Sequence, residues 1–202
     1  LEDGDIATVT QGNVSIFHHG NRVERPVELI DWSVEDGKKG GFAHYMLKEI
    51  FEQPQVFYNT IRGITDAPLP DCGSLRDPVT IVACGSSYHA GLIFKYLLEE
   101  CCQIPARLDY ASEFRYYPPP ANGLVIGITQ SGETADTLMA LRMAKAHNCN
   151  TLAITNVLGS TVTRLADSTL YMRAGPEISV AATKSFMAQL AVLMRIVNNF
   201  CG

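Results

Sequence analysis

The chain has 202 residues, of which 47% are hydrophobic, enough for one substantial core and a small appended unit. Its formal net charge is −5 and its basic residues form no cluster, which argues against a nucleic-acid partner. The sequence has no apolar run of about 18 residues and no signal-peptide pattern, so we expect a cytoplasmic protein that does not contact a membrane.

The beginning of the chain predicts a β-hairpin followed by a linker. Two alternating runs flank the turn residues 11–13, so residues 1–19 are expected to form a hairpin that pairs with a sheet mostly outside this chain. From 20 to 41 the composition turns polar and rich in glycine, which is typical of a linker. The main domain is then expected at 42–202.

The main domain is predicted to begin with helical segments. Apolar residues at helical spacing between 43 and 61 predict a helix that is interrupted at Pro54, where a second helix is expected to begin. Prolines and glycine at 68–78 predict a loop that leads into the first buried strand.

From residue 79 onward short apolar strands alternate with helices. Strands are expected near 79–83, 106–110, 124–128, 151–155 and 168–172, and helices near 87–102, 133–147 and 183–200. Uninterrupted apolar strands of this kind form parallel sheets that are covered on both faces. The sequence therefore predicts an α/β fold, a doubly wound, flavodoxin-like, five-stranded parallel sheet with helices on both faces.

The segment 129–137 (TQSGETADT) follows a buried strand and opens a predicted helix. Its hydroxyls and the amides of the helix's first turn can bind an anion, most plausibly a phosphate, and Gly132 lets the backbone approach it closely. Glu133 is expected in the first turn of the helix, where acidic residues suit the dipole. An ordinary N-cap with a capping box would give a similar pattern.

A second turn of the same design occurs at 84–87 (CGSS), again between a strand and a helix. Because the carboxyl ends of neighbouring parallel strands lie at one edge of the sheet, both turns are expected to face one crevice at the topological switch point. A third junction, 173–182, places Glu177 near that crevice and Thr183 as the N-cap of the last helix. Glu177 is a candidate ligand contact, although loop glutamates are more often solvated.

The cysteines and histidines suggest neither a metal site nor a disulfide framework. The six cysteines (72, 84, 101, 102, 149 and 201) form no CxxC pair, and several lie in apolar runs, which predicts buried reduced thiols. Cys84 is placed where a nucleophile is conceivable, but a packed thiol is the better interpretation. His18 and His19 are adjacent on a predicted strand and point to opposite faces, so no metal or other cofactor is expected.

Four segments together resemble the sugar isomerase (SIS) domain of the glutamine–fructose-6-phosphate aminotransferase family. They are 84–87 (CGSS), 112–116 (SEFRY), 129–137 (TQSGETADT) and 177–186 (EISVAATKSF). The run 44–54 (HYMLKEIFEQP) resembles the segment that leads into that domain, and 1–7 (LEDGDIA) resembles the end of the family's glutaminase domain. The resemblance covers nearly the whole chain in order.

The resemblance implies an activity and a set of binding residues. The family makes glucosamine 6-phosphate from fructose 6-phosphate and glutamine. By this resemblance, the phosphate is held by Thr129, Gln130, Ser131 and Thr134, and the sugar is contacted by Ser86, Ser87, Val180 and Ala182. The family usually has threonine at the position of Ser86 and often serine at those of Thr129 and Ala182, so the contact of residue 182 loses a hydroxyl here.

The resemblance also implies partners and catalytic groups that the chain does not contain. A glutaminase domain that releases ammonia is expected before this segment, and a second SIS domain that carries the catalytic residues is expected after it. The chain is therefore interpreted as a fragment that is inactive alone, and we expect a homodimer; Glu177 is the one catalytic candidate within it. A non-catalytic SIS sugar-phosphate sensor and a related deglycase or phosphosugar isomerase are the alternatives.

Overall fold

The structure is a computed structural model that describes residues 1–27, 29, 33, 35–65, 79–117 and 123–201. The chain divides into two compact units, Leu1–Asp31 and Trp32–Gly202. The predicted loop 68–78 lies outside the described residues. None of the described helices is long and apolar enough to cross a membrane.

The first unit is a small antiparallel sheet. Strands β1 (Asp5–Thr10) and β2 (Asn13–His18) form the predicted hairpin, and β3 (Asn21–Val23) pairs with β2. Strand β3 falls inside the range predicted as linker, so that expectation is wrong at these three residues, because the chain reverses again at Gly20 and continues the ladder. Asp5 fixes the sheet by accepting hydrogen bonds from Arg25 at 2.8 and 2.9 Å.

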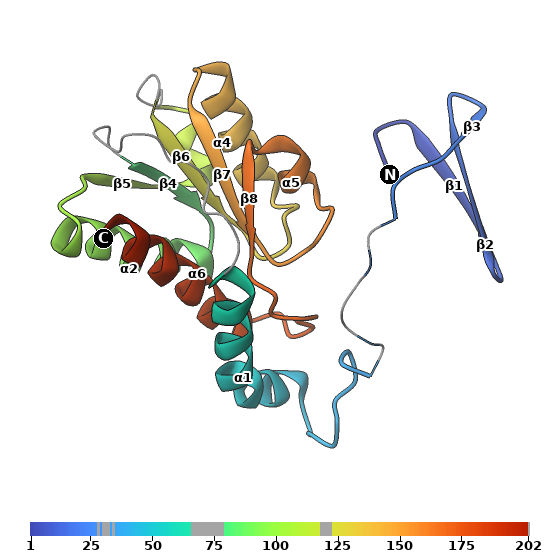
Figure 1. The fold of residues 1–202 in the computed structure, drawn as a ribbon, viewed down its shortest axis with the longest axis horizontal. Coiled ribbons are helices and arrows are strands. Elements are labelled where there is room, and N and C mark those ends of the chain that lie inside the picture. Colours follow the sequence, from blue (N-terminus) through green and yellow to red (C-terminus); the bar gives the residue numbers. More distant parts are fainter. Residues whose placement is uncertain (28, 30–32, 34, 66–78, 118–122, 202) are drawn as a thin grey trace. The chain divides into compact units, whose positions relative to one another are not determined.

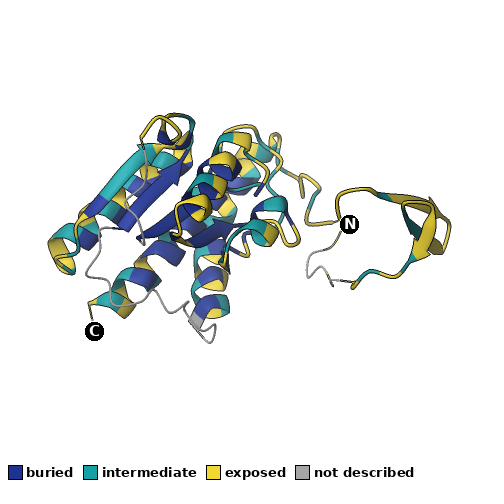
Figure 2. Cartoon of the chain, turned by 90° about the horizontal axis from the view of Figure 1, so that it is seen from above, coloured by how far each residue is buried: buried dark blue, intermediate teal, exposed yellow. Residues whose placement is uncertain are grey.

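The second unit contains the predicted parallel sheet. Its strands are β4 (Val79–Ala83), β5 (Ala106–Tyr110), β6 (Leu124–Ile128), β7 (Asn150–Thr155) and β8 (Ser168–Tyr171), in the spatial order β5-β4-β6-β7-β8. All four pairings are parallel. The α/β doubly wound prediction is confirmed, and β4 and β6 are buried along their whole length, as the dark blue strands of Figure 2 show.

Helices cover both faces of the sheet, as predicted (Figure 1). The long ones are α1 (Tyr45–Thr65), α2 (Ser86–Cys101), α4 (Ala135–Ala146) and α6 (Lys184–Phe200). Alternate residues of β4 divide between two hydrophobic clusters: the cluster of Ile81 includes residues of α1, α2 and α6, whereas that of Val82 includes residues of α3 (Ala111–Phe114), α4 and α5 (Thr161–Leu165). The short helices α3 and α5 were not predicted from the sequence.

Helix α1 is continuous, so the predicted interruption at Pro54 is wrong. A proline inside a helix removes one hydrogen bond and costs about 3 kcal/mol. That cost is offset by burial: Val56 and Ile64 join the core, and the Thr60 hydroxyl lies 2.5 Å from the Met172 carbonyl oxygen after β8. Tertiary packing therefore decides the path of α1.

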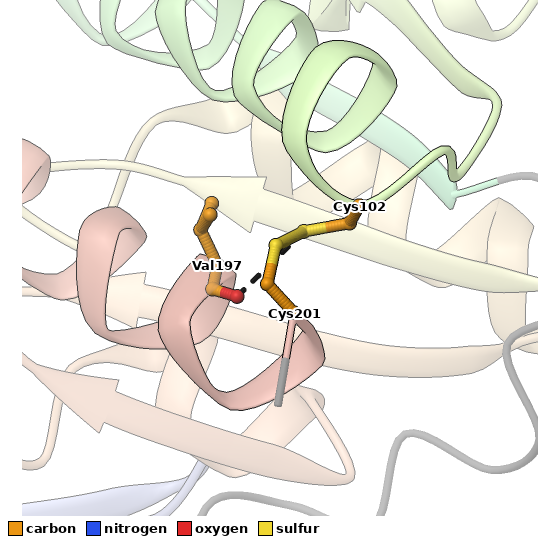
Figure 3. The surroundings of a disulfide bond; sticks show 3 residues. All are labelled: Cys102, Val197 and Cys201. Carbon is orange, nitrogen blue, oxygen red and sulfur yellow. Dashed lines mark hydrogen bonds between the residues drawn. A yellow bond between two sulfur atoms is a disulfide. The ribbon is translucent and has the colours of Figure 1, made fainter.

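A disulfide joins the ends of α2 and α6, which corrects the prediction of reduced thiols for two of the cysteines. Cys102 directly follows α2 and Cys201 directly follows α6, and Figure 3 shows the bond between them. Their Cα atoms are 5.0 Å apart although 99 positions separate them in sequence. Two helices that pack side by side bring the cysteines together, which local sequence patterns do not reveal.

Candidate functional site

The two predicted turns lie next to each other at the carboxyl edge of the sheet. Strands β4 and β6 are direct neighbours, and their last residues, Ala83 and Ile128, are paired in register. From β4 the chain passes to β5 on one side, and from β6 it continues to β7 on the other, so the topological switch point lies between β4 and β6. The prediction that residues 85–87 and 129–134 reach the same edge is confirmed.

The hydroxyl loop, residues 129–134, folds onto itself in front of α4. The hydroxyls of Thr129 and Thr134 are 3.0 Å apart, and the amide of Gly132 donates to the Thr129 hydroxyl at 3.2 Å. Thr134 is the N-cap of α4, yet its side chain makes no capping hydrogen bond. Because this side chain does not cap the helix, the amides of the first turn of α4 are available to another acceptor, as an anion site requires.

Neighbouring elements fix the backbone of the hydroxyl loop. The Gln130 carbonyl accepts from the amide of Asn156 at 3.1 Å, and the Gly132 carbonyl accepts from the amide of Val162 at 3.0 Å. Gly132 has a φ of +70°, and an added Cβ would lie 2.1 Å from the Ser160 hydroxyl. The loop is therefore pre-shaped, which reduces the ordering cost of binding.

Glu133 has a different role from the one predicted. Helix α4 begins at Ala135, so Glu133 precedes its first turn and accepts a hydrogen bond from the Thr161 amide at 2.7 Å. This bond, followed by one from the Thr161 side chain, holds the pKa of Glu133 below its ordinary value. Glu133 therefore stabilises the beginning of α5 with its carboxylate and ties the hydroxyl loop to that helix.

The turn at 84–87 presents one exposed and one buried hydroxyl. Gly85 has a φ of 59°, which directs the chain into α2, and Ser86 is exposed whereas Ser87 is buried. The side-chain amide of Gln189, itself fully buried on α6, donates to the Ser87 hydroxyl at 2.9 Å. Because this bond uses one lone pair of the Ser87 oxygen and not its proton, Ser87 can still donate that proton to a ligand.

The loop between β8 and α6 carries the remaining predicted residues. Glu177 accepts from the amides of Thr183 at 3.0 Å and Ser185 at 3.1 Å, and from the Ser185 hydroxyl. Thr183 is the N-cap of α6 as predicted, but the cap is supplied by the Glu177 carboxylate because the Thr183 side chain makes no capping bond. Val180 is exposed and Ala182 is half-buried. Their contact with a sugar, and a catalytic role for Glu177, stay predictions.

Sequence reasoning missed two polar side chains that support the site. Gln189 lies on the apolar face of α6, and Glu49 lies on the buried face of α1. A polar residue on an otherwise apolar helix face was the available signal, because such a residue needs a buried partner. Among the described residues, no three His, Cys, Asp or Glu side chains are grouped to hold a metal ion.

Comparison with known proteins matches this architecture to a family. The sequence model of one protein family, the SIS domain, matches residues 76–198. The chain belongs to the SIS domain family. The SIS match includes both turns and the loop before α6, but begins after α1.

Curated and solved SIS relatives include aminotransferases. A glutamine–fructose-6-phosphate aminotransferase (isomerizing) of Halobacterium salinarum is 49% identical over 95% of this chain and 34% of its own length. The C-terminal domain of the glucosamine–fructose-6-phosphate aminotransferase of Francisella tularensis is 39% identical, with a TM-score of 0.75 over 81% of this chain and 49% of that chain. A glucosamine-6-phosphate deaminase of Thermotoga maritima is 25% identical, with a TM-score of 0.61 over 78% of this chain and 51% of that chain. The chain thus spans about a third of the length of the curated relatives it matches.

Proposed function

We propose that this chain is the sugar-phosphate-binding SIS module of a glutamine–fructose-6-phosphate aminotransferase, with fructose 6-phosphate as its ligand. Support comes from the 49% identity to an aminotransferase across 95% of the chain and from the turns that face one edge of the sheet. The relatives' names supply the reaction, and the hydroxyl loop supplies a chemically suitable site for the ligand's phosphate.

The observation that carries the proposal is the uncapped beginning of α4 behind the hydroxyl loop. The Thr134 side chain makes no capping hydrogen bond to the first-turn amides of α4, and Thr129 and Ser131 add hydroxyls beside them. A phosphate dianion accepts from such donors and is favoured by the helix dipole, without any lysine. In the proposal Thr129, Gln130, Ser131 and Thr134 bind the phosphate.

The sugar then lies toward the turn 84–87 and the loop before α6. Ser86 and Ser87 donate hydroxyl protons to it, and Val180 and Ala182 contact it from the opposite loop. Ala182 offers no hydroxyl, so its contact is through the backbone or its methyl group. Glu177 supports this loop by capping α6.

The wider proposal concerns the whole aminotransferase. A glutaminase domain would supply ammonia, a second SIS domain would carry the catalytic groups, and the enzyme would act in the cytoplasm as a homodimer. In this arrangement the chain described here binds and orients the sugar phosphate but does not complete the reaction alone. The residues 1–7 and the three strands β1–β3 would belong to the glutaminase side.

The proposal is tested by removing two hydroxyls from the loop. The double substitution Ser131→Ala and Thr134→Ala should weaken fructose 6-phosphate binding at least about 100-fold, because each hydrogen bond to a charged group contributes about 1.5–3 kcal/mol. Isothermal titration calorimetry measures the affinity. The matched control, Thr8→Ala with Ser15→Ala, removes the same two residue types from the small sheet and should leave binding unchanged. An unchanged affinity in the loop variant would refute the site.

A further inference from the structure

The loop between β8 and α6 is held by a buried carboxylate from another part of the chain. Glu49, on α1, is 2% exposed and accepts hydrogen bonds from the amides of Ile178 at 2.7 Å and Ser179 at 3.1 Å. Its second oxygen accepts from the Ser179 hydroxyl. In Figure 1 this loop runs beside α1 before it enters α6. Three donors from two consecutive loop residues thus converge on one side chain.

Glu49 is ionised in this environment. Burial raises the pKa of Glu49, but the Ser179 hydroxyl, the two loop amides and the positive charge of Lys184 together lower it below its ordinary value. A buried charge is tolerated only where hydrogen bonds replace its lost hydration. The loop amides provide that replacement, so the carboxylate and the conformation of the loop stabilise each other.

A second carboxylate on α1 holds the end of the same loop. Glu52, one turn after Glu49, accepts a hydrogen bond at 2.7 Å from Lys184, the buried first residue of α6. A cation at the beginning of a helix opposes the helix dipole, and pairing with Glu52 offsets that cost. Helix α1 therefore contacts the loop at Ile178 and Ser179 and again at Lys184.

The segment between these anchors carries Val180 and Ala182. Val180 is 106% exposed, so packing of its own side chain does not hold it in place. The Ser179 hydroxyl also lies 3.0 Å from the Ala181 carbonyl oxygen, and the Glu177 carboxylate accepts a hydrogen bond from the amide of Thr183. The conformation of this tip is thus determined by polar anchors on either side of it.

We propose that Glu49 is a positioning residue for the sugar-binding tip at Val180 and Ala182, and that α1 is therefore a functional part of the site. This inference rests on the proposed function, since it concerns the same ligand. Helix α1 lies outside the range that the SIS model matches, 76–198, so the support for the tip comes from a segment that precedes the matched domain. Glu49 does not contact the ligand and acts only through Ser179 and Ile178.

The test compares Glu49→Gln with the unchanged chain, using two ligands. Glutamine keeps the size of the side chain but loses the charge and one acceptor oxygen. We expect fructose 6-phosphate to bind about tenfold more weakly, because charge-assisted hydrogen bonds to the loop are lost. Inorganic phosphate, which reaches only the hydroxyl loop, should bind with unchanged affinity. The control Glu100→Gln makes the same charge change at an exposed position on α2 and should alter neither affinity.

Amide hydrogen exchange gives a second readout that needs no ligand. In Glu49→Gln the amides of Ile178 and Ser179 should exchange at least about tenfold faster, because their acceptor is weakened. Unchanged exchange, an unchanged affinity for fructose 6-phosphate, or an equal loss of both ligands would each overturn the inference. If the unchanged chain binds neither ligand, the proposed function fails, and the exchange measurement alone decides whether Glu49 positions the loop.

A milder variant covers the case in which Glu49→Gln does not fold. Ser179→Ala removes the hydroxyl link and leaves the two amide bonds to Glu49 in place. It should weaken fructose 6-phosphate binding by about threefold, with no effect on phosphate, since one neutral donor is lost. Equal affinities of Ser179→Ala and the unchanged chain for the sugar phosphate would overturn the inference.

Discussion

Gly132→Ala should destabilise the chain more than the same change at Gly85. Both glycines begin a helix-forming turn, and both have positive φ, +70° at Gly132 and +59° at Gly85. An alanine at either position carries a backbone strain of about 1–3 kcal/mol, since both lie in regions of φ and ψ that residues with a Cβ rarely adopt. Only Gly132 is also enclosed: an added Cβ would lie 2.1 Å from the Ser160 hydroxyl oxygen and 2.5 Å from its Cβ.

The clash between an alanine Cβ at position 132 and the Ser160 side chain is not easily relieved, because hydrogen bonds hold both residues in place. The Gly132 carbonyl is hydrogen-bonded to the Val162 amide at 3.0 Å, and the Ser160 hydroxyl donates to the Val157 carbonyl at 2.8 Å. Overpacking of this kind costs about 1–3 kcal/mol. With the backbone strain, Gly132→Ala should lower the free energy of unfolding by roughly 2–6 kcal/mol, against about 1–3 kcal/mol for Gly85→Ala, where nothing lies within 4 Å of the added carbon.

Urea denaturation followed by circular dichroism measures both losses. Adding Ser160→Gly should recover much of the steric part of the Gly132→Ala loss, because the two clashing atoms belong to the Ser160 side chain. The reasoning is refuted if the two alanine variants lose equal stability, or if Ser160→Gly makes the loss in Gly132→Ala larger.

Three further outcomes are expected. Pro54→Ala should raise the free energy of unfolding by up to about 3 kcal/mol, measured by urea denaturation, because α1 regains a hydrogen bond; a decrease would show that the proline ring itself stabilises the packing of α1. Hydrogen bonding to Arg25 is the main cause that lowers the pKa of Asp5 below its ordinary value of 3.8, so the carboxylate stabilises the small sheet fully above that pH and the stabilisation is lost as the pH falls through the lowered pKa. Arg25→Ala should move this loss to higher pH, as followed by NMR of β1 and β2, and an unmoved transition would contradict the assignment. Cys102→Ser should lower the free energy of unfolding by about 4 kcal/mol and abolish any effect of a reductant, since a long loop is no longer closed in the unfolded chain; an unchanged chain that is insensitive to reductant would count against the bond to Cys201.

The strands were predictable because burial on both faces leaves a continuous apolar run. Strands β4, β5 and β6 have the predicted bounds, and β7 differs by one residue at its beginning. The adjacency of the two turns followed from the general rule on parallel sheets. Helices α3 and α5 are 4 and 5 residues long, too short for an apolar period to be recognised.

What escaped the sequence analysis depends on contacts between distant residues. The hydrogen bonds between Ser179 and Glu49 and between Gln189 and Ser87 span 130 and 102 positions, and nothing local in either segment indicates the partner. The continuity of α1 through Pro54 likewise depends on packing against other elements. The supporting side chains of a site are harder to predict than the turns that form it, because only the turns have a local pattern.

The bond between Cys102 and Cys201 closes a covalent ring that contains four strands of the parallel sheet, β5 to β8, but not β4. Strand β4 enters from outside this ring and is hydrogen-bonded to β5 on one side and β6 on the other. A protease that cuts once between the two cysteines therefore leaves both pieces attached, and a nicked molecule migrates as one band on a gel until a reductant separates them.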